Sequence, residues 1–239
     1  MNNIIKFKNY NRIKGATVKN NFFTDKFVPD APICGPPEAW RITMELKELL
    51  KYLKIKNQTE EEYSLREIRN ITNDILSMSF NYSGRCATPI VKIAKLFDFK
   101  IYKESLNESG DININGETRK KYGHDKVILV NRDEELFHQR FVVAHELAHY
   151  LFDYIGNAKY RDKNILFADT YQKDKHETPQ EKRANTFAAE IMMPKELFIK
   201  QYNVAKVTDS NHMFIVMYLS RYFETSIESI ERRIMEVSR

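Results

Sequence analysis

The segment His145-Glu146-Leu147-Ala148-His149 contains the residues best suited to chemistry in this 239-residue chain. Histidines four residues apart lie one turn apart on the same face of a helix, where two neutral imidazoles can bind one Zn²⁺. Glu146 would lie about 100° around that helix from His145, so its carboxylate could take a proton from water without binding the metal. The pattern predicts a metal-dependent hydrolytic site.

A motif this short also occurs by chance on solvated helices, in on the order of 1 in 100 chains of this size. The neighbouring sequence argues against chance, because apolar residues surround the motif on nearly all sides of the helix: Phe141, Val142, Val143, Ala144, Leu147, Ala148, Tyr150 and Leu151. Such a helix is buried, and two imidazoles and a carboxylate buried with it need partners. A metal ion would be one such partner.

A catalytic zinc site needs a third protein ligand and one open position. A metzincin would have a histidine at position 155 and a glycine at 152, but Ile155 and Phe152 occupy these positions and exclude that class. The third ligand therefore comes from elsewhere in the sequence. Five residues are candidates: Asp153, His176, Glu177, Glu181 and Glu190.

Glu181 is the preferred third ligand. It lies in the first turn of a predicted helix in which Ala184 and Ala188 share its side, and these small residues would allow a close approach to the motif helix. A second interpretation stays open at this point. Thr178-Pro179-Gln180-Glu181 is also a capping box, in which Glu181 would only satisfy the backbone at the start of its own helix.

The spacing of apolar residues predicts the elements that position these side chains. Helices are expected at about 38–54, 61–79, from Pro89 to about 97, 136–152 and 178–193, and strands at 100–106, 111–115 and 126–131. The last strand is apolar throughout, which indicates burial, and two or three helices fill the remainder. The fold class is therefore α+β. We divide the chain into an N-terminal extension (1–82), a domain that contains the motif (83–200) and a C-terminal helical hairpin (201–239).

Composition limits the class of protein. The net charge of +5 comes from dispersed lysines and arginines, so a solvated surface is favoured over a nucleic-acid footprint. The sequence has no apolar run long enough to span a bilayer and no N-terminal apolar segment typical of a secretory signal. Two cysteines cannot form a disulfide framework, and a reduced cytoplasmic setting is expected.

Two segments together resemble the ImmA/IrrE family of metallo-endopeptidases. They are the motif segment Arg140–His149 and the segment Glu181–Pro194, which reads Glu-Lys-Arg-Ala-Asn-Thr-Phe-Ala-Ala-Glu-Ile-Met-Met-Pro. Residues 89–96 and 127–131 also look like that family's entry helix and strand. The resemblance covers roughly half the chain, from Pro89 to about Leu197, and has no counterpart in residues 1–82.

The resemblance implies a gluzincin-like minimal metalloprotease domain. In this family the acidic residue ahead of the Ala-Asn pair is the third zinc ligand, which corresponds to Glu181 here and leaves Glu190 as a reserve ligand. Family members are typically cytoplasmic proteins of bacteria, phages and mobile elements, and many cleave a helix-turn-helix repressor to relieve repression. The resemblance thus implies Zn²⁺ as cofactor, a repressor as protein substrate and a role in transcription regulation.

Two further features give secondary hypotheses. Cys34, in Pro32-Ile33-Cys34-Gly35-Pro36-Pro37, is a possible inhibitory ligand, since a thiolate could occupy the open zinc position; an incidental Cys in a turn is the simpler interpretation. Residues 219–234 have the spacing of a helix-turn-helix, with Arg232-Arg233 outward. This segment supports an alternative function, a non-proteolytic regulator that binds DNA or a transcription factor. A packing hairpin is favoured, because three glutamates would oppose a phosphate backbone.

For the peptidase hypothesis, we expect the substrate to lie along a strand edge near Val127 to Asn131.

Overall fold

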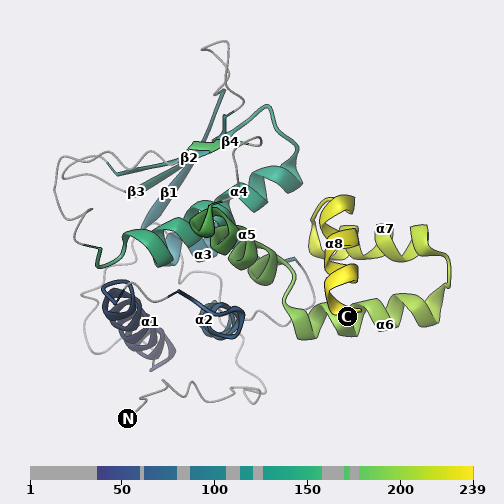
Figure 1. Ribbon diagram of the computed structural model, residues 1–239, viewed down its shortest axis with the longest axis horizontal. Helices are drawn as coiled ribbons and strands as arrows, with labels where there is room; N and C mark the ends of the chain where they lie inside the picture. The colour runs from purple at the N-terminus through teal and green to yellow at the C-terminus, as the bar shows by residue number, and fades with distance from the viewer. Residues whose placement is uncertain are drawn as a thin grey trace.

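The computed structural model describes residues 37–59, 62–79, 87–105, 114–120, 126–157, 170–172 and 178–238. It has the predicted α+β class (Figure 1), with these elements in chain order: α1 (Pro37–Lys56), α2 (Leu65–Met78), α3 (Ile90–Leu96), β1 (Phe99–Glu104), β2 (Ile114–Lys120), β3 (Lys126–Asn131), α4 (Leu136–His149), the π-helix η2 (Tyr150–Tyr154), β4 (Thr170–Gln172), α5 (Pro179–Met192), α6 (Lys195–Thr208), α7 (His212–Phe223) and α8 (Ile227–Val237). Within these ranges, no helix combines the length and apolar content that crossing a membrane requires.

The four strands form one mixed sheet in the order β1-β3-β2-β4. Strand β3 pairs in parallel with β1 and antiparallel with β2, and β2 pairs antiparallel with β4. The strand predicted at 126–131 is confirmed at both ends. The strand predicted at 111–115 overlaps β2 only at its start, and residues 111–113 lie outside the described residues.

The expected substrate edge near Val127 to Asn131 is wrong, because β3 is an internal strand. Ile128, Leu129 and Val130 are buried between two neighbouring strands. An apolar run of this kind indicates a strand that is buried on both faces, and it does not show whether the two edges of the strand are paired. Among the described strands, the outer positions of the sheet belong to β1 and β4.

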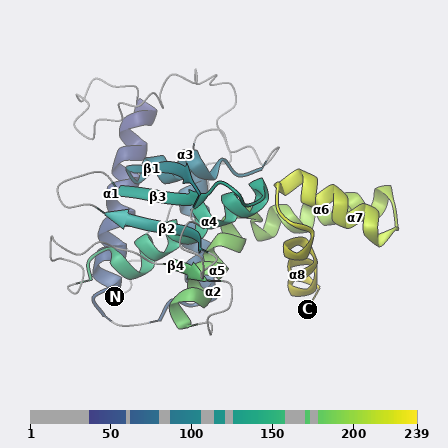
Figure 2. The same ribbon diagram turned by 90° about the horizontal axis from the view of Figure 1, so that it is seen from above.

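The motif helix α4 lies at the centre of the molecule. Every residue from Val142 to His149 is buried, as its composition predicted. Figures 1 and 2 show α4 against the sheet, with α5 packed along it and α1 and α2 on the side away from the sheet. The sequence predicted a regular α-helix to residue 152. In the structure the α-helix ends at His149, and the wider π-helix η2 follows it. Single π-helical turns of this type are frequent at functional sites.

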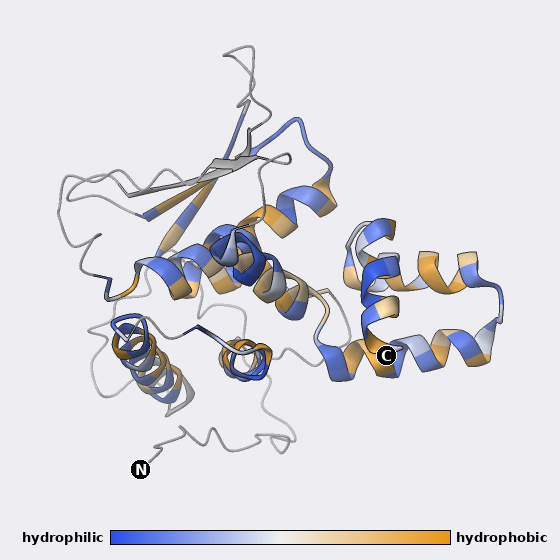
Figure 3. Ribbon diagram, viewed as in Figure 1, coloured by the Kyte–Doolittle hydropathy of each residue, from blue (hydrophilic) through white to orange (hydrophobic). Residues whose placement is uncertain are grey.

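Helices α1 and α2 correspond to those predicted at 38–54 and 61–79. Both are amphipathic, with hydrophobic and hydrophilic sectors visible in Figure 3, where they are seen nearly end-on. Their buried apolar residues join the same core as α4 and α5; these include Leu46, Leu49, Leu53, Ile68, Ile71 and Ile75. The N-terminal helices are therefore packed on α4 and α5 through one continuous hydrophobic core.

Three helices follow α5, at the upper limit of the expected number, and they project to one side of the molecule (Figures 1 and 2). Ser226 caps the start of α8. Of the three isoleucines whose spacing favours an inward face, Ile230 and Ile234 are buried, whereas Ile227 is exposed. The expectation that Arg233 points outward is wrong, since only 2% of its surface is exposed. Its guanidinium group turns inward because two carboxylate oxygens of Glu190 on α5 accept hydrogen bonds from it, at 2.8 and 3.0 Å.

Candidate metal centre

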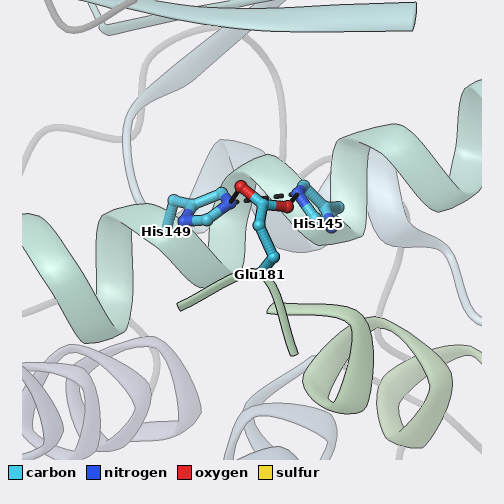
Figure 4. A group of neighbouring side chains, drawn as sticks. All are labelled: His145, His149 and Glu181. Carbon is cyan, nitrogen blue, oxygen red and sulfur yellow. Dashed lines mark hydrogen bonds and ion pairs between the residues drawn. The ribbon is translucent and has the colours of Figure 1, made fainter. Parts of the chain in front are cut away.

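His145, His149 and Glu181, here termed the candidate ligand group, meet between α4 and α5 (Figure 4). The Nε2 atoms of the two histidines are 3.0 Å apart. The Glu181 carboxylate lies across from both, with Oε2 3.2 Å from His145 Nε2 and Oε1 3.5 Å from His149 Nε2. Ligand atoms around a tetrahedral Zn²⁺ are about 3.4 Å apart, given bonds of about 2.1 Å. The spacing of these nitrogen and oxygen atoms fits such an ion.

The Nδ1 atoms of the two rings fix which nitrogens face the centre. His145 Nδ1 lies 3.0 Å from Asn185 Oδ1, and His149 Nδ1 lies 2.8 Å from Asp153 Oδ2. Both oxygens are acceptors, so we assign the ring protons to Nδ1. The Nε2 lone pairs are then directed at one another and at an anionic carboxylate. Acceptor atoms that converge in this way repel each other unless a cation lies between them.

The shifted pKa values of His149 and Glu181 also indicate that positive charge is favoured at this position. Burial alone would lower the pKa of His149, but hydrogen bonds to Asp153 and Glu181 and the negative charge of Glu146 outweigh it and raise the pKa to about 10. The pKa of Glu181 is lowered, first by its hydrogen bonds to the two histidines, with burial acting in the opposite direction. A proton or a metal cation is therefore stabilised at this position.

Glu146 is the buried neighbour of His145, with 1% of its surface exposed. Its charge reaches His149, since it is among the groups that raise the pKa of that ring. A carboxylate whose charge acts on His149, and which is not in the candidate ligand group, has the chemistry of a proton acceptor.

Glu181 is brought to the histidines by the start of α5. The Thr178 hydroxyl caps this helix by accepting a hydrogen bond from the Glu181 backbone N–H at 3.2 Å. Ala184 and Ala188 are buried between the helices, where the sequence predicted small residues. The capping box is therefore only half formed: Thr178 caps the Glu181 backbone, but the Glu181 carboxylate turns to the histidines and not to the backbone at the start of its own helix.

The other predicted site residues lie elsewhere. Glu190 is in the same helix as Glu181, but its carboxylate pairs with Arg69 and Arg233 and is not part of the candidate ligand group. Cys34, weighed as an inhibitory ligand, and the early candidates His176 and Glu177 lie outside the described residues.

Sequence reasoning missed the residues that orient the ligands. Asp153 was weighed as a metal ligand, yet its two oxygens bind His149 Nδ1 and the guanidinium of Arg183. Asn185, four residues after Glu181, holds the ring of His145. Such carboxylate and amide partners fix the tautomer of a metal-binding histidine. The i,i+4 spacing of His149 and Asp153 was a local signal that could have identified this pair.

The comparison with protein families decides the class. The model of the IrrE N-terminal-like domain, Peptidase_M78, matches residues 99–235, more than half of the chain. The chain belongs to this peptidase family. The resemblance to ImmA/IrrE metallopeptidases is thereby confirmed, and the chain is a metallopeptidase with the minimal metalloprotease fold. No curated protein matches it.

The Peptidase_M78 match begins at β1 and ends within α8, so it contains the candidate ligand group and Glu146. It runs past residue 200, where the sequence analysis began a separate C-terminal hairpin. It leaves α1, α2 and α3 outside, although these helices contribute to the same hydrophobic core.

Proposed function

We propose that this Peptidase_M78 protein is a zinc-dependent endopeptidase in which His145, His149 and Glu181 hold the zinc ion and Glu146 is the general base. One observation carries the proposal: two imidazole nitrogens and a carboxylate converge beside a buried glutamate inside the domain that the family model matches. Two nitrogen ligands and one oxygen ligand suit zinc, and three protein ligands are the number found in catalytic zinc sites.

Zinc held there would supply a Lewis acid that polarises a peptide carbonyl and makes water acidic near neutral pH. The chain's own residues do the rest. Glu146 accepts the proton of the attacking water and returns it to the amine that leaves. Asp153 and Asn185 keep the two imidazoles in the tautomer that presents Nε2 to the centre. Because the rings are held before substrate binds, little reorganisation is needed during the reaction.

The substrate we propose is a cognate helix-turn-helix transcriptional repressor, whose cleavage would relieve repression. Support comes from the ImmA/IrrE family, in which this substrate class is common. With it we propose a cytoplasmic setting, a role in transcription regulation and an origin in a mobile element. We also keep the division into an extension (1–82), a peptidase domain (83–200) and a C-terminal hairpin (201–239) as a proposal.

The test substitutes Glu146→Gln, which keeps the size of the side chain and removes its basicity. We expect cleavage of the repressor encoded beside this gene to fall by about 10²- to 10⁴-fold, the contribution typical of a general base. Zinc content should stay the same, since Glu146 is not one of the proposed ligands. Glu196→Gln, at an exposed position in α6, is the matched control and should cleave normally. Undiminished repressor loss with Glu146→Gln would refute the proposal.

A second candidate is a regulator that binds DNA or a transcription factor without cleaving it. It is favoured by the three-residue turn between α7 and α8, where Glu224 adopts a left-handed φ of 50°, a connection typical of helix-turn-helix units. It is weakened by Arg233, whose charge is used by Glu190 inside the protein. Exposed Glu228 faces solvent near Arg232 in the same helix. Salt-sensitive DNA binding that survives Glu146→Gln would favour this candidate.

A further inference from the structure

The orientation of His149 depends on the π-helix that follows it. Asp153 lies within η2, and its Oδ2 accepts a hydrogen bond from His149 Nδ1 at 2.8 Å. Its other oxygen, Oδ1, pairs with Arg183 of α5. Any shift in the path of this five-residue turn moves Asp153 and so rotates the imidazole.

The turn is held by a residue almost a hundred positions earlier in the chain. Asn57, directly after α1, donates hydrogen bonds from Nδ2 to the backbone oxygens of Leu151 and Ile155, at 2.9 and 2.8 Å. Carbonyl groups at a helix end need partners of this kind from outside the helix. Asn57 therefore satisfies two backbone groups on either side of Asp153.

Tyr63 fixes the direction of that amide. Its hydroxyl donates to Asn57 Oδ1 at 2.6 Å, so both ends of the amide are engaged. A flipped amide would place its oxygen against two carbonyl oxygens, which is unfavourable. Asparagine is thus the side chain that fits, because an aspartate at position 57 would bring a negative charge to the same two carbonyls.

The ring of Tyr63 makes a second connection to the site. It packs edge-on against Phe152 of η2, with ring centroids 4.8 Å apart. The guanidinium carbon of Arg183 lies 5.8 Å from the centroid of the same ring. Arg183 is the partner of Asp153 and lies two residues after Glu181, so Tyr63 contacts both segments that carry the candidate ligands.

The backbone around η2 allows this close contact with α1. Gly156 has a φ of +79°, and a Cβ at this position would lie 2.5 Å from the backbone oxygen of Lys54. Its own backbone oxygen accepts a hydrogen bond from Gln58 Nε2 at 3.2 Å. Only glycine combines this φ with so near an approach. The end of α1 and the end of η2 thus form a fitted contact.

We propose that Asn57 and Tyr63 are positioning residues that hold His149 in its metal-binding orientation through η2, Asp153 and Arg183. The inference rests on the proposed metal centre and gives a role to a segment outside the Peptidase_M78 match. Partners that orient a metal ligand typically contribute 10- to 100-fold in metal affinity. Asn57 and Tyr63 act one step farther out, so their loss should fall near the lower end of this range.

The experiment measures the zinc dissociation constant of the full chain by competition with a chromogenic chelator, well below the unfolding temperature. Asn57→Asp should weaken zinc binding by about tenfold or more, and Tyr63→Phe, which loses only the hydroxyl, by about threefold to tenfold. Thr59→Val is the matched control, since the Thr59 hydroxyl donates to the backbone oxygen of Lys56 in the same turn. It should bind zinc like the wild type.

A second readout separates positioning from general stability. Co²⁺ in the site should give a visible absorption spectrum that changes in Asn57→Asp and Tyr63→Phe but not in Thr59→Val, whatever the unfolding temperatures. Wild-type zinc affinity and an unchanged Co²⁺ spectrum in Tyr63→Phe would overturn the inference while leaving the metal centre intact. A wild-type chain that binds no zinc would overturn the metal centre itself, and the inference with it.

Discussion

Helix α5 carries two glutamates with opposite surroundings. Glu181 lies in its first turn and Glu190 nine residues later, which is two and a half turns and so the opposite side of the helix. The carboxylate of Glu181 faces the imidazoles of His145 and His149. The carboxylate of Glu190 faces the guanidinium groups of Arg69 and Arg233.

The difference shows that burial alone does not place a carboxylate in the candidate ligand group. Glu190 is the more buried residue, with 3% of its side chain exposed against 26% for Glu181. Its charge is matched by Arg233 and Arg69, which both bind its carboxylate. Glu181 instead completes a set of converging acceptors and keeps one side accessible, as a catalytic site requires for its substrate. Arginine side chains lie next to Glu190, whereas imidazoles lie next to Glu181. This difference in neighbouring groups separates the two carboxylates.

Removing the cation from the buried pair of Glu190 and Arg233 should have the largest effect on stability. Arg233→Met leaves Glu190 buried without its main partner, and we expect the free energy of unfolding to fall by about 3–5 kcal/mol. Urea unfolding followed by circular dichroism measures it. The double variant Glu190→Leu with Arg233→Met replaces both charges with apolar groups and should recover most of the loss. A double variant as unstable as Arg233→Met would contradict this account of the pair.

Zinc affinity should separate the two glutamates directly. Glu181→Gln removes a proposed ligand charge and should weaken zinc binding by more than about 100-fold, beyond the range for residues that only orient ligands. Glu190→Gln, the matched substitution in the same helix, should leave the affinity of the folded protein within about twofold. Chelator competition measures both at a temperature where both variants are folded. Equal losses of affinity would show that the contrast between the two carboxylates is wrong.

The cap of α5 gives a smaller effect that acts on only one of the glutamates. Thr178→Ala removes the hydroxyl that accepts a hydrogen bond from the Glu181 backbone, which costs about 1 kcal/mol of stability. Because the first turn of α5 presents Glu181, zinc binding should weaken together with stability. Thr186→Ala, which loses a hydroxyl bonded within the same helix, is the control and should not change zinc affinity. Stability lost without any change in zinc affinity would mean that the cap does not position Glu181.

The sequence could predict only those features of α4 and α5 that depend on local spacing along a helix. His145 and His149 follow from helical periodicity, and the small residues Ala184 and Ala188 follow from the same rule applied to α5. The partner of Glu190 could not be predicted from helical periodicity, because Arg233 is 43 residues away and its inward turn depends on how α8 packs. For the same reason no sequence pattern indicated Asn57, whose contacts with η2 span 94 and 98 residues.

The position of β3 shows a different limit. Its apolar residues correctly predicted burial, but burial alone did not reveal that β1 and β2 pair with it on both sides. Strand order depends on pairing between distant segments, and the β2 segment has little apolar periodicity of its own. The expected substrate edge therefore failed while the strand itself was predicted at its observed bounds.

A third carboxylate, that of Asp74, extends the comparison, and we expect its effect to be the smallest. The charge that acts on it is that of another acid. Burial, and then the negative charge of Glu45 on α1, raise the pKa of Asp74 on α2 to about 7. The folded protein therefore holds this proton more tightly than the unfolded chain, where the pKa is about 4. Between these pH values the folded state binds more protons, so stability should decrease as the pH rises from about 4 to 7.

Asp74→Asn removes this decrease by making the side chain neutral in both states. We expect the unfolding temperature of the variant to exceed that of the wild type by more at pH 8 than at pH 5. Differential scanning calorimetry at the two pH values measures it, with Asp209→Asn at an exposed position of the chain as the control. The difference cancels other titrating groups, including those of the candidate ligand group. A variant whose advantage is equal at both pH values would mean that Asp74 ionises normally, and that this half-buried acid needs no cation to keep its charge.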